Sequence, residues 1–170
     1  MDLHGSPDDD FPDACHFAEY RGARYRVRLD SVRDGTTEIP LLLDHEPDLE
    51  QYPDARGTDR FHVHWTVTVP RRALSRLYLR EGFGSWVDYR VRFGPLRERY
   101  RRRPILLEID HPGAIHPVLA EALGIAGHWR NADYRVMIQD PAEVEDLEIR
   151  VTELPAGPGW AAQVAPESRR

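Results

Sequence analysis

The chain has 170 residues, of which 41% are hydrophobic, so it is long enough for one domain with a substantial core. Its formal net charge of −6 argues against a general nucleic-acid coat protein, because such proteins carry a strong basic excess, although it permits a local basic patch. Cys15 is the only cysteine, which excludes an intramolecular disulfide and a zinc site built from thiolates.

The chain carries no sequence signal for export or membrane insertion. Its N-terminus is acidic and lacks the apolar segment of a signal peptide, and no apolar run is long enough to span a membrane. A lone cysteine also suits a reducing compartment, so we expect a cytoplasmic protein with no membrane partner. Every basic residue is an arginine, whose guanidinium binds carboxylate or phosphate through two parallel hydrogen bonds.

Composition separates the two ends of the chain from its body. Residues 1–14 are acidic, and residues 155–170 are rich in Pro, Gly and small side chains, so neither end buries enough surface to offset the entropy of ordering. We expect a disordered acidic tail, a single α+β domain at 15–154 and a flexible tail. Trp160 is an exception, because a lone indole in such a tail is expected to dock on the body.

The body begins with a predicted β-hairpin. Strands are expected at 23–32 and 37–44, joined by a turn at Asp34–Gly35. Pro40 lacks a backbone N–H, which predicts an edge or bulged position for the second strand. The acidic and Pro-rich segment 45–59 is typical of a long surface loop.

The rest of the body alternates strand and helix patterns in the order β-α-β-β-α-β. This order predicts a ferredoxin-like α+β core, in which the first and third strands pair at the centre and both helices cover one face of the sheet. The N-terminal hairpin and a C-terminal strand extend this core. The predicted elements are strand 60–69, a helix from Pro70 to Gly82 with an apolar stripe (Ala73, Leu74, Leu77, Tyr78), strands 85–93 and 104–110, a helix from Pro117 to Gly124 with Val118, Leu119, Ala120 and Leu123 apolar, and strands 132–139 and 147–154.

Strand alternation assigns the side chains of this core to an inner and an open face, and a slip of one residue would exchange the two faces. Inward residues are expected at Phe61, Val63, Trp65, Val67, Val69, Val87, Tyr89, Val91, Phe93, Ile105, Leu107, Ile109, Tyr134, Val136 and Ile138. Outward residues are expected at His62, His64, Thr66, Thr68, Asp88, Arg90, Arg92, Leu106, Glu108, Asp110, Arg135 and Met137.

The two histidines on this open face allow three interpretations. In the first, His62 and His64 bind a divalent metal with Asp110 or Glu108 as third ligand and water as the fourth, for hydrolysis. In the second, the histidines act with Glu108 and Asp110 as metal-free acid/base groups, and the pKa of a histidine beside Glu108 is raised. In the third, the same residues form a solvated charge network or are covered by the N-terminal hairpin or by a second subunit in a homodimer.

A second candidate site is the arginine-rich hairpin at 90–104, which joins the predicted strands 85–93 and 104–110. Arginines interleaved with an aromatic side chain suit a phosphate backbone and an unstacked base. The alternative is a solvated loop whose arginines pair with the abundant carboxylates. The candidate partner-binding residues are Arg90, Arg92, Arg97, Arg99, Tyr100, Arg101, Arg102 and Arg103, with Arg135 on the predicted strand 132–139.

Three functions remain open on the sequence. The first is a non-catalytic binding module that holds an anionic partner, either nucleic acid or an acidic protein surface, through the polar sheet face and the arginine hairpin. The second is an enzyme that uses His62 and His64 with Glu108 and Asp110 on an anionic substrate. The third is an acidic inhibitor or immunity-type protein whose 45–59 segment covers a basic site on a toxin.

Overall fold

The computed structural model describes residues 14–27, 31–61, 64–94, 105–110, 115–128 and 133–164. These residues form two compact units. Unit 1 contains the described residues of 15–79 and 151–164, and unit 2 contains Ala14 and the described residues of 80–150. Strands β6 and β11 contribute residues to both units.

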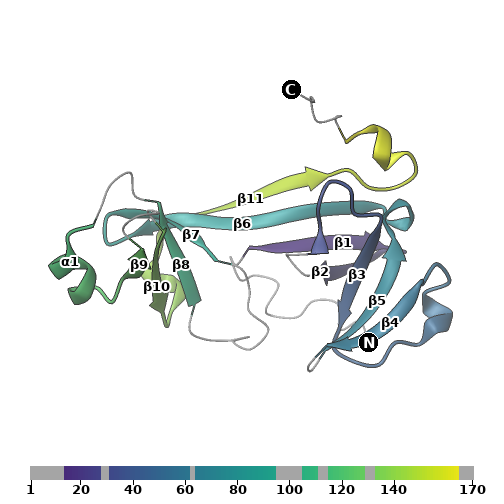
Figure 1. Cartoon of the computed structure of the whole chain (residues 1–170), viewed down its shortest axis with the longest axis horizontal. Helices are drawn as coiled ribbons and strands as arrows, with labels where there is room; N and C mark the ends of the chain where they lie inside the picture. The colour runs from purple at the N-terminus through teal and green to yellow at the C-terminus, as the bar shows by residue number, and fades with distance from the viewer. Residues whose placement is uncertain are drawn as a thin grey trace. The chain divides into compact units, whose positions relative to one another are not determined.

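Unit 1 is a sheet with the strand order β4-β5-β3-β2-β1-β6 (Figure 1). The β1/β2, β2/β3, β3/β5 and β4/β5 pairs are antiparallel. Its strands are β1 (Cys15–Tyr20), β2 (Ala23–Val27), β3 (Glu38–Leu43), β4 (Gly57–Phe61), β5 (His64–Pro70), and the first residues of β6 (Arg76–Trp86). Short 3-10 turns lie at η3 (Leu49–Gln51), η4 (Arg71–Ala73) and η7 (Trp160–Ala162).

The core of unit 1 forms because β3 and β5 bring branched apolar side chains into register. Leu41 lies opposite Val67 and Ile39 opposite Val69, and all four are fully buried. Buried partners from the other elements complete the cluster: Ala18, Tyr20, Val27, Leu43, Tyr52, Leu74 and Leu77.

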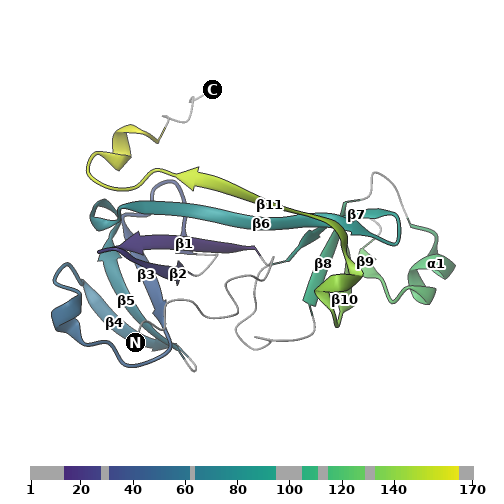
Figure 2. The same ribbon diagram turned by 180° about the vertical axis from the view of Figure 1, so that it is seen from behind.

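Unit 2 has the strand order β6-β7-β8-β10-β9, with β7/β8, β8/β10 and β9/β10 antiparallel. Its strands are β7 (Tyr89–Phe93), β8 (Ile105–Asp110), β9 (Ala126–His128) and β10 (Asp133–Ile138), with one short helix, α1 (Pro117–Ala122), and a 3-10 turn, η6 (Pro141–Glu143). β11 (Glu145–Leu154) pairs with β6, and Figure 1 and Figure 2 show the two strands side by side. The core residues include Trp86, Val91, Phe93, Ile105, Leu107, Ile109, Tyr134, Val136, Ile138 and Val144.

Two hairpins turn through consecutive residues with left-handed backbone. Val87 (φ 47°) and Asp88 (φ 63°) connect β6 to β7, and Arg21 (φ 51°) and Gly22 (φ 81°) connect β1 to β2. Two-residue turns of this kind match the right-handed twist of the flanking strands. Valine rarely adopts this conformation, so the sequence gives no turn signal at Val87.

The predicted ferredoxin-like α+β fold is wrong, because the described residues are nearly all β-sheet with one short helix. The helix expected at 70–82 is replaced by the 3-10 turn η4 and the strand β6. Leu77 packs in the unit 1 core, whereas the adjacent Tyr78 packs with Cys15 and Phe17 in a separate cluster. A strand that is buried on both faces has apolar neighbours in sequence, which imitates the apolar stripe of a helix.

Other predicted elements fare differently. The helix that starts at Pro117 is confirmed, with Gly124 in left-handed backbone (φ 67°) after its end. The 60–69 strand is instead an antiparallel pair, in which Phe61 of β4 lies opposite His64 of β5. The 23–32/37–44 hairpin is confirmed as β2 and β3. The edge position expected for Pro40 is wrong, because β3 pairs with strands on both sides, and the alternative of a bulge stays a prediction.

Trp160 docks on the body of unit 1, as expected, with its ring 4.4 Å from the guanidinium carbon of Arg71. The predicted domain at 15–154 and the predicted tails stay predictions. Among the described residues, no helix has the length and apolar character needed to cross a membrane.

Candidate functional site

The clearest candidate site is the open face of the unit 2 sheet, where charged side chains from neighbouring strands meet. Along β7, Arg90 and Arg92 are exposed while Val91 and Phe93 are fully buried. The same alternation in β8 buries Ile105, Leu107 and Ile109 and turns Glu108 and Asp110 outward, and in β10 it turns Arg135 and Met137 outward. The inward and outward assignments predicted within β7, β8 and β10 are therefore confirmed. The inward assignment of Val87 is wrong, because Val87 is 52% exposed in the turn before β7.

Strand register converts this alternation into rows of side chains. Arg92 of β7 lies opposite Glu108 of β8, which in turn lies opposite Arg135 of β10. In the next outward-facing row, Arg90 lies opposite Asp110. Residues directly opposite each other in adjacent strands share a face and lie within side-chain reach, so charges of opposite sign alternate across the sheet.

Arg92 is the centre of the ionic contacts on this face. Its Nε donates a hydrogen bond to Glu108 at 3.0 Å, a second guanidinium nitrogen also contacts Glu108, and Nη1 lies 3.6 Å from Glu81. The hydrogen bond to Glu108 raises the pKa of Arg92. About half of the Arg92 side chain (48%) stays exposed, so the pairing leaves it accessible to a partner.

β11 adds a further ion pair to the same face. Glu148 lies 3.6 Å from Arg90 and accepts hydrogen bonds from Arg150 at 2.8 and 3.2 Å. The Arg150 guanidinium also lies 4.5 Å from the centre of the Phe83 ring, and Arg90 lies 5.9 Å from it. The hydrogen bond from Arg150 is the main cause of the lowered pKa of Glu148.

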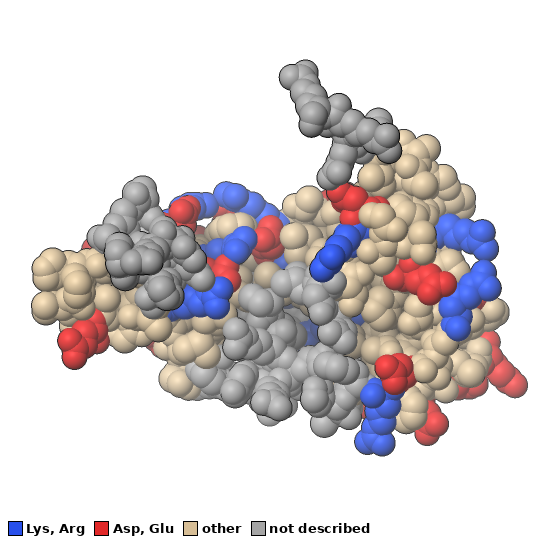
Figure 3. Space-filling model, viewed as in Figure 1, with Lys and Arg blue, Asp and Glu red and all other residues tan. Residues whose placement is uncertain are grey.

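The resulting surface, which we name the charged face, balances four acidic with four basic side chains. Outside the grey atoms, Figure 3 shows basic and acidic atoms next to one another at several points of the surface in view. The charged face consists of Glu81, Arg90, Arg92, Glu108, Asp110, Arg135, Glu148 and Arg150.

His64 does not belong to this face. The prediction that it is exposed on an open sheet face is wrong, because it is 4% exposed within unit 1, and its Nδ1 lies 3.4 Å from the Asp44 carboxylate. Its strand β5 pairs with β3 and β4, whereas the strand of Glu108 and Asp110 pairs with β7 and β10. The predicted pairing of these two strands at the centre of the sheet is therefore absent.

The predicted metal and acid/base sites required β5 and β8 to be neighbours, so that His64 would lie beside Glu108 and Asp110, and the two strands do not pair. Within the described part of the chain, no three or more His, Cys, Asp or Glu side chains are grouped so that they could hold a metal ion. His62 lies outside the described residues, so its role as ligand or acid/base group stays a prediction. The partner-binding residues Arg97, Arg99, Tyr100, Arg101, Arg102 and Arg103 also lie outside them, and their role likewise stays a prediction.

Sequence reasoning missed a buried arginine in unit 1. Arg71 is only 1% exposed, and burial lowers the pKa of its guanidinium. Its Nε and Nη1 donate hydrogen bonds to the backbone carbonyls of Pro155 (2.7 Å), Arg33 (2.9 Å), Thr36 (3.2 Å) and Asp34 (3.3 Å). With Trp160 over the guanidinium, this side chain joins the β2–β3 turn to the segment that follows β11.

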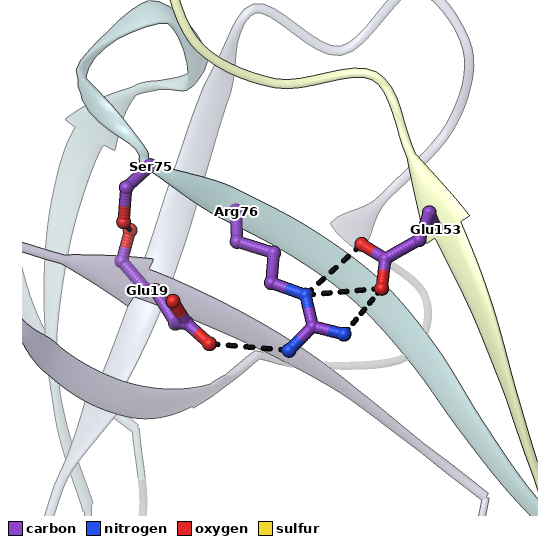
Figure 4. Close-up of polar contacts among 4 residues, drawn as sticks. All are labelled: Glu19, Ser75, Arg76 and Glu153. Carbon is purple, nitrogen blue, oxygen red and sulfur yellow. Dashed lines mark hydrogen bonds and ion pairs between the residues drawn. The ribbon is translucent and has the colours of Figure 1, made fainter.

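Arg76 is a second structural arginine of unit 1, and Figure 4 shows its contacts. Its Nη1 lies 3.3 Å from Glu19 of β1, and its Nε donates to Glu153 of β11 at 3.0 Å. Ser75 supports the arrangement by donating its hydroxyl to the Glu19 carbonyl at 3.1 Å. The contacts of Arg76 link three strands within unit 1.

Comparison of the chain with protein-family models, with curated proteins and with solved structures gives no match.

Proposed function

We propose that the protein is a non-catalytic binding module, and that its charged face contacts the surface of another protein. The observation that carries the proposal is the row in which Arg92, Glu108 and Arg135 alternate in sign across three hydrogen-bonded strands. The strand ladder holds these charges at fixed spacing, which favours a folded partner with complementary charges of both signs.

The balance of charges distinguishes between the classes of partner. A nucleic acid presents negative phosphates at short regular intervals and would meet Glu108 and Asp110 beside the arginines. A protein surface can place a basic group opposite each carboxylate and an acidic group opposite each arginine. The charged face therefore supports a protein partner, and contact with nucleic acid remains a prediction for the 97–103 segment. A cytoplasmic location is part of the proposal and rests on the lone cysteine.

The test uses the full chain, immobilised and exposed to a lysate of the cells that express it. The variant Arg90→Thr/Arg92→Thr removes two charges from the charged face, and threonine suits a strand. The matched control Arg56→Thr/Arg72→Thr removes two charges from exposed arginines of unit 1. We expect the wild type and the control to retain the same protein and the face variant to lose it, measured by quantitative mass spectrometry.

Nuclease treatment and salt complete the design. Retention that survives nuclease, and that weakens as salt is raised, fits a protein partner held by exposed charges. Equal retention by all three chains would refute the role of the charged face. Retention that nuclease abolishes would refute the protein partner in favour of a nucleic acid.

A further inference from the structure

β11 carries a row of exposed apolar side chains. Leu147, Ile149 and Val151 are 51%, 44% and 48% exposed. They occupy every second position, so they share one face of the strand, and Glu148 and Arg150 point to the other. Single exposed apolar residues are ordinary on a protein surface, but three in register on one strand indicate a contact surface.

The backbone of β11 is also open along one edge. β11 pairs with β6, and no second pairing with a strand is found for it in the described part of the chain (Figures 1 and 2). β11 contains no proline or lysine, residues that commonly prevent an edge strand from pairing further. Its one residue with left-handed backbone, Asp146 (φ 51°), lies at the start of the strand. The open edge from Leu147 to Leu154 therefore forms a template for another strand.

The sequence of β11 complements itself. In an antiparallel pair centred on Ile149, Leu147 of one copy lies opposite Val151 of the other, so the apolar side chains of both copies meet on one face. On the opposite face, Glu148 of each copy lies opposite Arg150 of the other, which places opposite charges together twice. This pairing therefore matches the apolar row and the Glu148 and Arg150 charges, while Glu145 lies opposite Glu153 at each end of the paired strands.

We propose that β11 pairs with β11 of a second copy, which makes the protein a two-fold symmetric dimer. Such a contact uses the same surface on both copies, so it closes at two subunits. Pairing at the edge of β11 adds a strand beside it. It involves Glu148 and Arg150 of the charged face, but none of the charged residues of β7, β8 and β10 that carry the proposed function. The inference therefore does not rest on the proposed function, and it differs from a homodimer through the open sheet face.

The first test is the mass of the untagged full chain by sedimentation over a series of concentrations. We expect a dimer, and we expect Ile149→Arg to raise its dissociation constant at least about tenfold, because two like charges then face each other at the centre of the pair. Val118→Arg is the matched control, since Val118 is 69% exposed on α1 and lies outside β11, and it should keep the wild-type dimer. A wild-type monomer at every concentration, an assembly larger than two, or equal dimerisation of Ile149→Arg would overturn the proposal.

The second test fixes the register through disulfide cross-linking. Oxidation should join two Ile149→Cys chains, because residue 149 lies opposite itself across the pair. The Leu147→Cys chain should not cross-link, because its two copies are offset by four residues, about 13 Å, which exceeds the roughly 7 Å that a disulfide can bridge. The wild type, whose single cysteine is buried, is the control. Equal cross-linking of the two variants, or none at position 149, would contradict this pairing.

Discussion

Unit 1 and unit 2 place their polar side chains in opposite ways. Every buried polar side chain among the described residues, namely His16, His64, Thr66 and Arg71, belongs to unit 1. In unit 2, Arg90 and Arg92 lie on an exposed face, where they meet carboxylates from other strands. The comparison teaches that a guanidinium group can be structural, as that of Arg71 is in unit 1, or available to a partner, as that of Arg92 is in unit 2.

The difference follows from what each arginine contacts. Arg71 donates to backbone carbonyls far apart in the sequence, at Arg33 and Pro155, and a buried carbonyl left without a donor is costly. Arg92 keeps about half of its side chain exposed (48%) while it pairs with the partly exposed Glu81 and Glu108, and ion pairs at a protein surface contribute little to stability. A substitution of Arg71 should therefore act on folding, and a substitution of Arg92 should act on binding.

The largest effect is expected for Arg71→Ala. Removing the guanidinium leaves buried carbonyls without donors and takes away the group beneath the Trp160 ring, so the free energy of unfolding should fall by about 3 kcal/mol or more. Urea unfolding monitored by tryptophan fluorescence measures the loss. The neighbouring Arg72→Ala is the control, because Arg72 is exposed, and its effect should be about 0.5 kcal/mol or less. Equal losses for the two variants would show that Arg71 does not join these segments.

A smaller loss is expected for Gly84→Ala in unit 2. A Cβ at this position would lie 2.4 Å from Cγ1 of Val144 and 2.7 Å from the backbone oxygen of Glu145. The backbone cannot move away as a flexible side chain can, so the substitution should cost about 1 to 3 kcal/mol in urea unfolding. Gly57→Ala is the control, since a Cβ there has no atom within 4 Å and the backbone φ is not positive. A Gly84→Ala chain as stable as this control would refute the close approach of β11 to β6.

The smallest expected effect is a pH dependence that belongs to unit 1. Burial, and then the nearby Arg71 charge, lower the pKa of His16 below its ordinary value of 6.5. The unfolded chain therefore binds a proton more readily than the folded chain, so the stability is fully present above pH 6.5 and declines as the pH falls toward the lowered pKa. Urea midpoints at neutral and mildly acidic pH measure this decline.

Two histidine variants isolate this contribution. His16→Gln should weaken the decline in stability on acidification, because the buried titrating group is removed. His45→Gln should follow the wild type, since His45 is exposed. Identical pH profiles for the wild type and His16→Gln would assign the decline to other groups.

The sequence predicts side-chain direction where one face of a strand is buried and the other exposed. β7, β8 and β10 follow this rule, and their outward residues formed the candidate face as expected. The rule fails for β1, β5 and β6, because both faces of these strands carry buried residues and the apolar pattern loses its alternation. β1 was not predicted at all, and β6 was predicted as a helix.

The role of Arg71 could not be predicted for a different reason. Its partners at Arg33, Thr36 and Pro155 lie 35 to 84 residues away, so no local pattern indicates that they meet. The contact between Glu148 of β11 and Arg90 of β7 likewise joins residues far apart in the sequence, so no local pattern predicts it. Alternation along a strand predicts faces, but the contacts between distant strands depend on a topology that the sequence did not indicate.

The most direct test of the contrast between the units is the free energy of unfolding of Arg90→Thr/Arg92→Thr beside that of Arg71→Ala. If the arginines of the charged face serve a partner, the double variant should lose no more than about 1 kcal/mol while Arg71→Ala loses about three times as much. A loss in the double variant equal to that of Arg71→Ala would show that Arg90 and Arg92 maintain the fold, and it would contradict their assignment to binding.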